Sequence, residues 1–468
     1  MQPLSALDAL FLHLETDETP MHVGALHLLK PPAGHSGDFA PAVREHVADR
    51  MPYAPVLTRR LRSLPLGFAN PVWETVRNVD LERHVQSVRL RRPGTHAQLL
   101  SEVARLHARR LEPGEPPWMF YLFDGLRSGQ LAFYTKFHHA ALDGAAAVAL
   151  AQALLDPGPV PRPMPPRAIP RARRTTLVSL LGTSLRSNTE QVARIAGRLP
   201  DAARVIVALL QNAPKFRFAP RTPLNLAIGA ERRIATLSIP MATIRTISAA
   251  HHATINDVVL AIVSGALRRY FEAAGGLPGQ SLVAAMPVSL REAGDERPTT
   301  LATMTLAELA TDVADPAARL RAIQTHTRAA KGLAQRLRSV MPTDFPSLGL
   351  PWLLSAAAQL YGRSRLADRL PPIANLVISN VPGPDVPLYL AGARLETWWP
   401  LSIVEHGLGL NVTVQSYAGA LHLGLVAAAS SIADLEPLAR AITASVRELQ
   451  PRAAAGARRR PSKPRREK

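Results

Sequence analysis

The chain contains no cysteine among its 468 residues. This absence excludes disulfide scaffolds, thiolate metal sites and thiol nucleophiles. Lysine is scarce as well, since it supplies only six of the 55 basic residues. No apolar run reaches the roughly 18 residues that a membrane-spanning helix needs. The N-terminus carries Asp8, Glu15 and Asp17 before any Lys or Arg, so it does not resemble a secretory signal. The sequence predicts a cytoplasmic protein, either free or peripheral at the inner membrane face or lipid inclusions.

The remaining composition is that of a folded protein with a basic surplus. Hydrophobic residues make up 47% of the chain and charged residues 19%, enough to fill two or three domains. Of the net charge of +19, residues 452–468 contribute +7 and residues 157–174 contribute +5. A basic tail is either solvated and disordered or attracted to anionic lipid. Because no nucleic-acid fold signature accompanies it, we expect no nucleic-acid partner.

Two breaks divide the chain. Residues 157–174 hold seven prolines in 18 positions, which excludes regular helix or sheet and predicts a linker. After Pro451 the sequence becomes rich in Ala, Arg and Pro. Residues 175–211 have helical spacing and predict connector helices, which either pack in a bundle or lie on a lipid surface. The predicted parts are an N-terminal lobe (1–156), a linker with connector helices (157–222), a C-terminal lobe (223–450) and a disordered basic tail (451–468).

Strands and helices are predicted on both sides of the connector. Short runs rich in aromatic and β-branched residues, or with alternating apolar and polar residues, predict strands. Apolar residues that recur with a period of 3.6 residues predict helices. The predicted strands are 131–138, 233–239, 281–288 and 375–381, the predicted helices are 145–155, 241–250 and 256–274, and a hairpin joins 408–416 to 421–427 across 417–420. This mixture predicts an α/β protein with two layered lobes.

One segment dominates the search for chemistry: His138-His139-Ala140-Ala141-Leu142-Asp143-Gly144, at the junction of a predicted strand and helix. An imidazole there can take a proton at neutral pH and return it later. Two alternatives remain open. The pair could bind a metal ion, or it could lie in a packed turn where both imidazoles only make hydrogen bonds within the protein. A metal site is disfavoured because the side chains of adjacent histidines point in different directions and because the sequence contains no H-E-x-x-H motif. No G-x-S-x-G or phosphate-binding loop occurs.

Residues 138–144 resemble the HHxxxDG motif of CoA-dependent acyltransferases of the chloramphenicol-acetyltransferase-like superfamily, which condensation domains of peptide synthetases share. Other segments, spread over about residues 3–450, resemble the bacterial wax ester synthase/diacylglycerol acyltransferases. These segments are Pro3-Leu-Ser-Ala-Leu-Asp8, Glu15-Thr-Asp-Glu-Thr-Pro-Met-His-Val-Gly24, Arg221-Thr-Pro-Leu-Asn225, Ile255-Asn-Asp-Val258, Pro287-Val-Ser-Leu-Arg291, Ser379-Asn-Val-Pro-Gly-Pro384 and Gly409-Leu-Asn-Val-Thr-Val414.

The resemblance implies a fold and an activity. The fold is two α/β lobes of the chloramphenicol-acetyltransferase type around a shared central channel, joined by a long helical connector. The activity moves a long fatty acyl group from acyl-CoA to a diacylglycerol or a long-chain alcohol, giving triacylglycerol or wax ester plus CoA. Acyl-CoA is a substrate, and no cofactor or metal is implied. His139 is the general base beside His138, Asp143 is structural and pairs with Arg291, and Gly144 permits close backbone approach.

Further residues are implied at the substrates, each with a structural alternative. Asn256 and Asp257 either steady the oxyanion or form part of a helix cap. Ser379 and Asn380 either contact substrate or make the turn before Pro-Gly-Pro. Trp118 is either a substrate contact or a core residue. Arg291 is either the partner of Asp143 or a surface charge.

Two other functions stay open. An amide-forming condensation enzyme would share the motif and need carrier-protein partners, and a non-catalytic relative would only bind lipid inclusions. The sequence departs from the family's usual residues at Pro117 and at the pair Thr299-Thr300. We expect these departures to affect substrate preference and turnover more than the fold.

Overall fold

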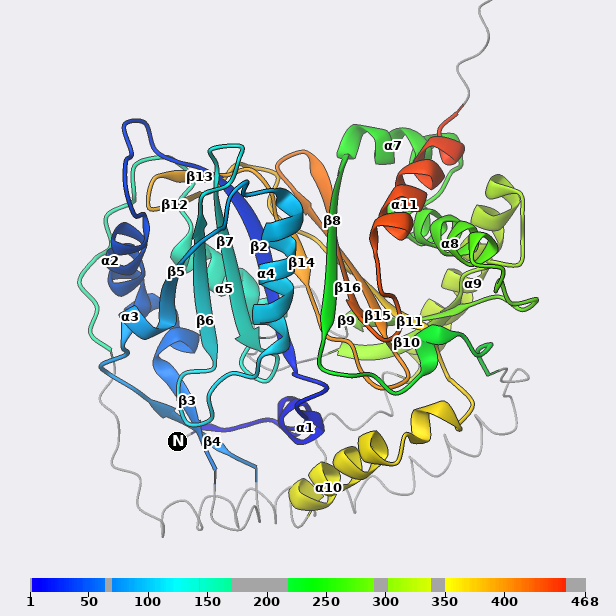
Figure 1. The fold of residues 1–468 in the computed structure, drawn as a ribbon, viewed down its shortest axis with the longest axis horizontal. Helices are drawn as coiled ribbons and strands as arrows, with labels where there is room; N and C mark the ends of the chain where they lie inside the picture. Colours follow the sequence, from blue (N-terminus) through cyan, green and yellow to red (C-terminus); the bar gives the residue numbers. More distant parts are fainter. Residues whose placement is uncertain are drawn as a thin grey trace, which may run out of the picture.

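The computed structural model describes residues 2–63, 70–142, 144–169, 218–289, 302–337 and 350–451. Two lobes lie side by side, each built on one large β-sheet with helices against it (Figure 1). The predicted α/β class with two lobes is confirmed. The connector predicted over 175–211, like the tail from residue 452 onward, lies outside the described residues.

The N-terminal lobe contains a seven-stranded sheet in the order β12-β13-β2-β7-β6-β5, with β14 also on β2. Its strands from this half of the chain are β2 (His22–Lys30), β5 (Val85–Arg89), β6 (Trp118–Asp124) and β7 (Leu131–His138). The helices are α2 (Ala40–Arg50), α3 (Leu81–His84), α4 (His96–Ala108) and α5 (Gly144–Leu154).

Side-chain alternation divides this sheet into two faces, as the pleat of a strand requires. Along β6, Phe120 and Leu122 enter a core with α2 and α5, whereas Tyr121 and Phe123 pack with α4. The second core also includes Val426 of the C-terminal lobe, so it lies between the two lobes. Helix α4 begins with a complete capping box between Thr95 and Gln98.

The C-terminal lobe contains a six-stranded sheet in the order β10-β9-β11-β15-β16-β8. Its strands are β8 (Arg232–Pro240), β9 (Val283–Ser289), β10 (Ala302–Glu308), β11 (Leu376–Val381), β15 (Leu410–Tyr417) and β16 (Ala420–Ala428). Helices α7 (Met241–Ala250), α8 (Ile255–Ala273), α9 (Pro316–Leu337) and α11 (Glu436–Leu449) accompany it. The fully apolar stretch 258–263 of α8 lies at the centre of this core.

Three short strands cross from the C-terminal half of the chain to the N-terminal sheet. They are β12 (Tyr389–Leu390), β13 (Ala393–Leu395) and β14 (Trp399–Leu401). β13 and β14 both pair with β2. The predicted division into 1–156 and 223–450 therefore does not separate the lobes, because residues 389–401 extend the other lobe's sheet. Strands of two or three residues are too short to show a period in the sequence.

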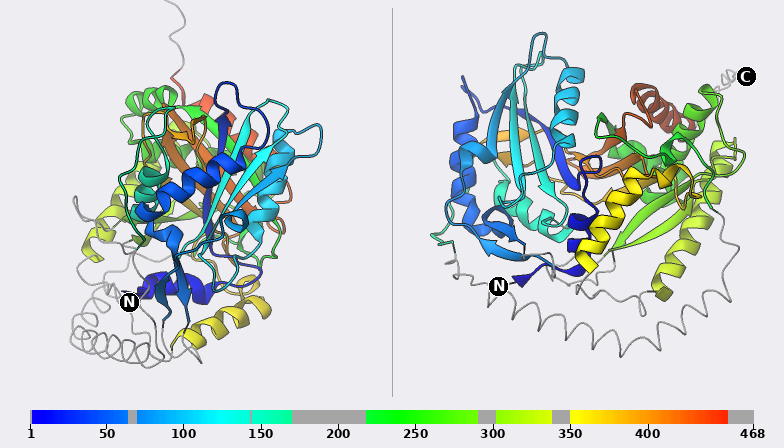
Figure 2. Two further views of the ribbon diagram at one scale, coloured as in Figure 1. Left: turned by 90° about the vertical axis from the view of Figure 1, so that its left-hand side faces the viewer. Right: turned by 60° about the horizontal axis from the view of Figure 1, so that its bottom comes forward.

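A third, smaller assembly closes one end of the molecule. β1 (Gln2–Pro3), β4 (Val72–Thr75) and β3 (Arg59–Arg62) form a three-stranded sheet. Helix α1 (Ala6–Leu14) leads from it and packs against α10 (Leu350–Arg363) of the C-terminal half. Figure 2 shows α1 and α10 side by side below the two sheets.

Most predicted elements agree with the structure. The strand predicted at 131–138 is β7, and the helix at 241–250 is α7, each with the predicted bounds. The predicted hairpin forms between β15 and β16, and both residues of its two-residue loop, Ala418 and Gly419, have positive φ. Such a loop matches the right-handed twist of the strands.

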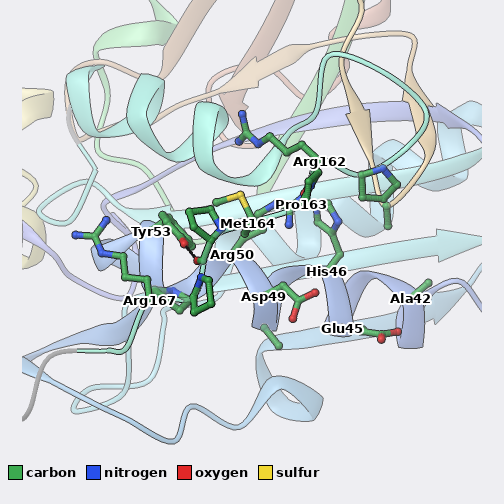
Figure 3. Close-up of a pocket in the computed structure, with 16 residues that line it drawn as sticks. Ala42, Glu45, His46, Asp49, Arg50, Tyr53, Arg162, Pro163, Met164 and Arg167 are labelled. Atoms are coloured by element: carbon green, nitrogen blue, oxygen red, sulfur yellow. Dashed lines mark hydrogen bonds between the residues drawn. The ribbon is translucent and has the colours of Figure 1, made fainter.

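The described part of the predicted linker, 157–169, contains no regular helix or strand. It packs on the N-terminal lobe, where Arg162 lies 3.4 Å from buried Asp156 and Tyr53 donates to the carbonyl of Pro165. Figure 3 shows Tyr53 and Arg162 among the residues that line a pocket of about 710 Å³ beside α2. The first half of the linker is also attached to α2, because the Arg50 side chain donates to the Arg162 carbonyl over 3.1 Å.

Candidate active site

The histidine pair lies where β7 ends. β7 pairs with β2 so that His138 stands opposite His22. Alternation along β7 places Tyr134, Lys136 and His138 on the same face, toward α4. One residue later the chain leaves the sheet, and the His139 N–H donates to the Met21 carbonyl over 2.8 Å. The end of the strand therefore separates the surroundings of the two imidazoles.

His138 is held inside the protein. Its side chain is 5% exposed, and its Nδ1 accepts the Ala140 N–H over 3.1 Å. Because Nδ1 is an acceptor, the proton of the neutral ring is on Nε2. That nitrogen lies 3.6 Å from Glu15 Oε1, slightly beyond hydrogen-bond length. A second proton on Nδ1 would face the Ala140 N–H, so His138 is poorly suited to serve as the base.

His139 is half-buried and has a different environment. Its ring stacks on Phe11 of α1, with centroids 3.9 Å apart and planes inclined by 13°. Phe11 comes from α1, a largely apolar helix whose N-cap, Ser5, accepts the Asp8 N–H. The stack fixes the plane of the imidazole. Of the two rings, His139 is therefore the less buried one and the one whose orientation an aromatic ring supports.

A buried polar cluster lies behind the histidine pair. Lys136 donates to the carbonyls of Leu106 and Arg109, and burial lowers the pKa of this lysine to about 7. His107 accepts the Tyr134 hydroxyl and donates to the Ser402 carbonyl, and burial followed by the charge of Lys136 lowers its pKa to about 3. These groups connect β7 and α4 with the segment after β14.

Glu15 is the acidic member of this cluster. Its carboxylate accepts the Met21 N–H over 3.2 Å and pairs with Arg110 over 3.0 Å. Burial by itself would raise the pKa of Glu15, but His138, Arg110 and the Met21 N–H together hold it below its ordinary value. No role was predicted for Glu15, Lys136, Phe11 or Arg110. The sequence did contain one sign of this buried polar cluster. Lys136 is a charged residue two positions before His138, in a predicted strand with mostly apolar residues.

The structure places Trp118 in the core. Its side chain is fully buried, its indole N–H donates to the Leu57 carbonyl over 3.1 Å, and its ring packs on Phe120 and His84. Every surface of the indole is thereby occupied by protein. The structure supports the core alternative and gives no support to a substrate contact.

Asp257 belongs to a helix cap. Thr254 is the N-cap of α8, and its hydroxyl and backbone N–H both donate to Asp257 in a complete capping box. The other carboxylate oxygen accepts the Thr327 hydroxyl over 2.8 Å. Both oxygens are thus used structurally. Asn256 is half-exposed in the first turn of α8, and no described contact joins it to the histidine pair.

Ser379 and Asn380 lie on β11, beside Thr413 and Val414 of β15. Ser379 is half-buried and Asn380 is exposed. The segment that follows passes close to β15, because a Cβ at Gly383 would collide with the Ser416 carbonyl. The predicted strand is confirmed, whereas the turn at Pro382-Gly-Pro384 and the relation of Ser379 and Asn380 to substrate stay predictions. Gly144 begins α5. Asp143 and Arg291 lie outside the described residues, and with them their predicted ion pair.

Two pockets of the described chain do not include His138 or His139. One is the pocket beside α2 in Figure 3, and the other, of about 640 Å³, lies at Met241, Arg245 and Asp385. The predicted central channel thus stays a prediction. Among the described residues no group of His, Asp and Glu is arranged to hold a metal ion, and no helix is long and apolar enough to span a bilayer.

Two α/β lobes with a histidine pair at the end of a strand define a protein of the chloramphenicol-acetyltransferase-like fold. Solved structures agree. The first condensation domain of the calcium-dependent antibiotic synthetase matches with a TM-score of 0.54 over 97% of both chains, and its 15% identity supports the fold alone. The wax ester synthase/diacylglycerol acyltransferase from Marinobacter aquaeolei VT8 matches with a TM-score of 0.69 and 31% identity over 96% of this chain and 98% of that one.

Sequence comparison gives the particular family. The profile of the wax ester synthase/diacylglycerol acyltransferase catalytic domain matches residues 4–259, and that of the C-terminal domain of the same family matches residues 301–450. The Mycobacterium tuberculosis protein named "Probable diacyglycerol O-acyltransferase tgs2" is 34% identical over 95% of this chain and 97% of its own. This chain belongs to the wax ester synthase/diacylglycerol acyltransferase family.

Proposed function

We propose that the protein is an acyl-CoA-dependent O-acyltransferase that uses a diacylglycerol or a long-chain alcohol as acceptor. Family membership supports the reaction class, and the relatives' names supply the two acceptor classes. The observation that carries the assignment to this chain is the contrast within the histidine pair. His138 is engaged by Ala140 and buried, whereas His139 is half-buried and supported by Phe11.

The proposed reaction needs both substrates together. His139 takes the hydroxyl proton of the acceptor, and the resulting oxygen attacks the thioester carbonyl. A new C–O bond forms, and the tetrahedral intermediate then collapses with cleavage of the C–S bond. The imidazolium returns its proton to the departing CoA sulfur, so the ring is neutral again after each turnover. Acyl-CoA is a substrate here, and the scheme uses no metal or other cofactor.

Acceptor-dependent release of CoA tests this function. Purified protein is incubated with palmitoyl-CoA and either dipalmitoylglycerol or hexadecanol, and the free thiol and the ester product are measured. We expect thiol release that depends on the acceptor and equals the ester formed. Release without ester, or no release with either acceptor, would contradict the proposed function. A requirement for a carrier protein and an amine acceptor would indicate a condensation enzyme instead.

We further propose that the protein associates peripherally with lipid through residues 360–373, called here the 360–373 surface. It carries three strongly exposed apolar side chains, Leu360 (64%), Leu370 (50%) and Ile373 (56%). Arg363, Arg365 and Arg369 are exposed beside them, and the one acid of this stretch, Asp368, is paired with Arg365. Exposed apolar groups with an excess of cations suit an anionic lipid surface.

Vesicle flotation at low salt tests this association. The wild-type chain should float with phosphatidylglycerol-containing vesicles and stay behind with phosphatidylcholine alone. Leu370→Glu should abolish flotation. Val386→Glu, which places the same charge on an exposed apolar position outside the 360–373 surface, should leave it unchanged. Equal flotation of both variants would place the lipid contact elsewhere.

A further inference from the structure

We infer that Glu15 is a positioning residue for His139: its carboxylate supports the turn that carries the base, by two separate routes. The inference rests on the proposed function, since it assigns a partner to the proposed base. Glu15 follows α1 and lies far from His139 in the chain, yet its side chain is only 8% exposed and lies beneath the histidine pair.

The first route runs through His138. The Ala140 N–H donates to His138 Nδ1, which leaves the ring proton on Nε2, 3.6 Å from Glu15 Oε1. The negative charge therefore favours the tautomer that the turn requires. If the ring changed tautomer, Nδ1–H would oppose the Ala140 N–H. The turn from His138 to Ala140 would then lose this hydrogen bond, and His139 lies in the middle of that turn.

His22 cannot replace His138 in this role. Its Nε2 is 3.5 Å from the same carboxylate oxygen, but that nitrogen accepts the Leu111 N–H over 3.3 Å. The ring proton is then on Nδ1, which donates to the His107 carbonyl. Of the two imidazoles beside Glu15, only His138 presents an N–H to the carboxylate. The charge of Glu15 therefore acts on His138.

The second route runs through Met21. Its N–H donates to Glu15 Oε1 over 3.2 Å, and its carbonyl accepts the His139 N–H over 2.8 Å. One peptide segment thus links the carboxylate to the backbone of the base itself. Arg110 binds the other oxygen, Oε2, over 3.0 Å and prevents the carboxylate from turning away. Arg110 also contacts Asp17, whose side chain is 84% exposed.

Loss of Glu15 should therefore lower the rate of the chemical step more than the affinity for substrate. A displacement of the base by about 1 Å can cost 10²-fold in rate. None of the contacts of Glu15 involves a residue proposed to bind acyl-CoA. A residue that only stabilised the fold would reduce the amount of folded protein and leave kcat per folded molecule unchanged.

The experiment compares Glu15→Ala and Glu15→Gln with two matched controls. Asp156→Asn removes another buried carboxylate of the N-terminal lobe, which pairs with Arg50 over 3.1 Å away from the histidine pair. Asp17→Asn removes the exposed partner of Arg110. For each variant kcat and KM for palmitoyl-CoA are measured per folded molecule, with thermal unfolding as the check. The His138 tautomer is determined by ¹⁵N NMR of histidine-labelled protein, its signals being identified by their loss in His138→Gln.

We expect Glu15→Ala to lower kcat about 10- to 100-fold with KM within about twofold. Glu15→Gln should lose less, because its amide oxygen still accepts the Met21 N–H, and it serves as the test if Glu15→Ala does not fold. Both controls should keep wild-type kcat. In the Glu15 variants the His138 proton should no longer be confined to Nε2.

Three results would overturn the inference: an unchanged kcat in the Glu15 variants, an equal loss of kcat in Asp156→Asn, or an unchanged His138 tautomer. Failure of the proposed function has a different signature, because the wild-type chain itself would then form no ester with either acceptor. Failure of His139 as the base would instead leave wild-type turnover in His139→Ala, whatever the Glu15 variants show.

Discussion

The phenyl ring of Phe11 lies flat against the imidazole of His139, with 3.9 Å between the ring centroids. Phe11 belongs to α1, which contacts α10 from the other half of the chain. One of these contacts joins Ser355 Oγ of α10 to His13 Nδ1 of α1 over 3.3 Å. The orientation of the proposed base is therefore supported by an element that both halves of the chain hold in place.

Replacement of Phe11 tests this support. An aromatic stack contributes about 0.5–1.5 kcal/mol beyond area burial, so Phe11→Leu should lower kcat roughly 2- to 10-fold. KM for palmitoyl-CoA should stay within about twofold. Phe11→Tyr keeps the ring and should retain nearly wild-type kcat. If Phe11→Leu and Phe11→Tyr had equal kcat, the stack would have no part in orienting His139.

Asp257 and its neighbour Asn256 should respond differently to substitution. Loss of an N-terminal cap costs about 0.5–2 kcal/mol, and Asp257 also accepts the Thr327 hydroxyl. Asp257→Ala should therefore lower the free energy of unfolding by at least about 1 kcal/mol, measured by urea denaturation, with kcat per folded molecule unchanged. Asn256→Ala should be nearly neutral for stability. A large loss of kcat in Asn256→Ala would support the oxyanion alternative for that residue.

Acid should destabilise the protein through three buried histidines. Burial lowers the pKa of His27 and His422 to about 4, and the pKa of His107 to about 3. Between these values and 6.5 the unfolded chain binds more protons than the folded one, so stability falls as pH decreases through this window. Each group contributes up to about 1.4 kcal/mol per pH unit.

Urea denaturation at several pH values between 8 and 5 checks this expectation. The free energy of unfolding should fall steeply below pH 6. Above pH 7 it should still rise with pH, because burial lowers the pKa of Lys136 to about 7 and the unfolded chain then holds the lysine proton more tightly than the folded one. His27→Gln should reduce the slope, because it removes one of the titrating groups while its amide can still donate to the Thr397 carbonyl. A free energy of unfolding independent of pH over this range would contradict the buried neutral state of these rings.

Local patterns predicted the elements but not the contacts between them. β7 was predictable because aromatic residues and Thr fill a short run, and the hairpin because the short segment Tyr417-Ala-Gly-Ala420 separates two apolar runs. The crossing of β14 to β2 was not, because three residues carry no period. The contact of Glu15 with His138 was not predictable either, since it joins the end of α1 to the end of β7, and only the assembled sheet brings them together.

For the histidine pair, too, the sequence predicted the residues but not their contacts. Its motif identified the two candidate rings, whereas their different roles depend on surroundings contributed by other segments. The Ala140 N–H fixes one ring, and Phe11 supports the other. For Trp118 the sequence left two alternatives, and burial on every side now supports the core position.

The identity of the base is tested most directly by His139→Ala in the thiol-release assay with palmitoyl-CoA and dipalmitoylglycerol or hexadecanol. General acid–base catalysis contributes about 10²–10⁴-fold, so kcat should fall by that factor, corresponding to about 3–5 kcal/mol in the barrier. Thermal unfolding should be close to that of the wild type, because the ring is only half-buried. Wild-type turnover in folded His139→Ala would contradict the account.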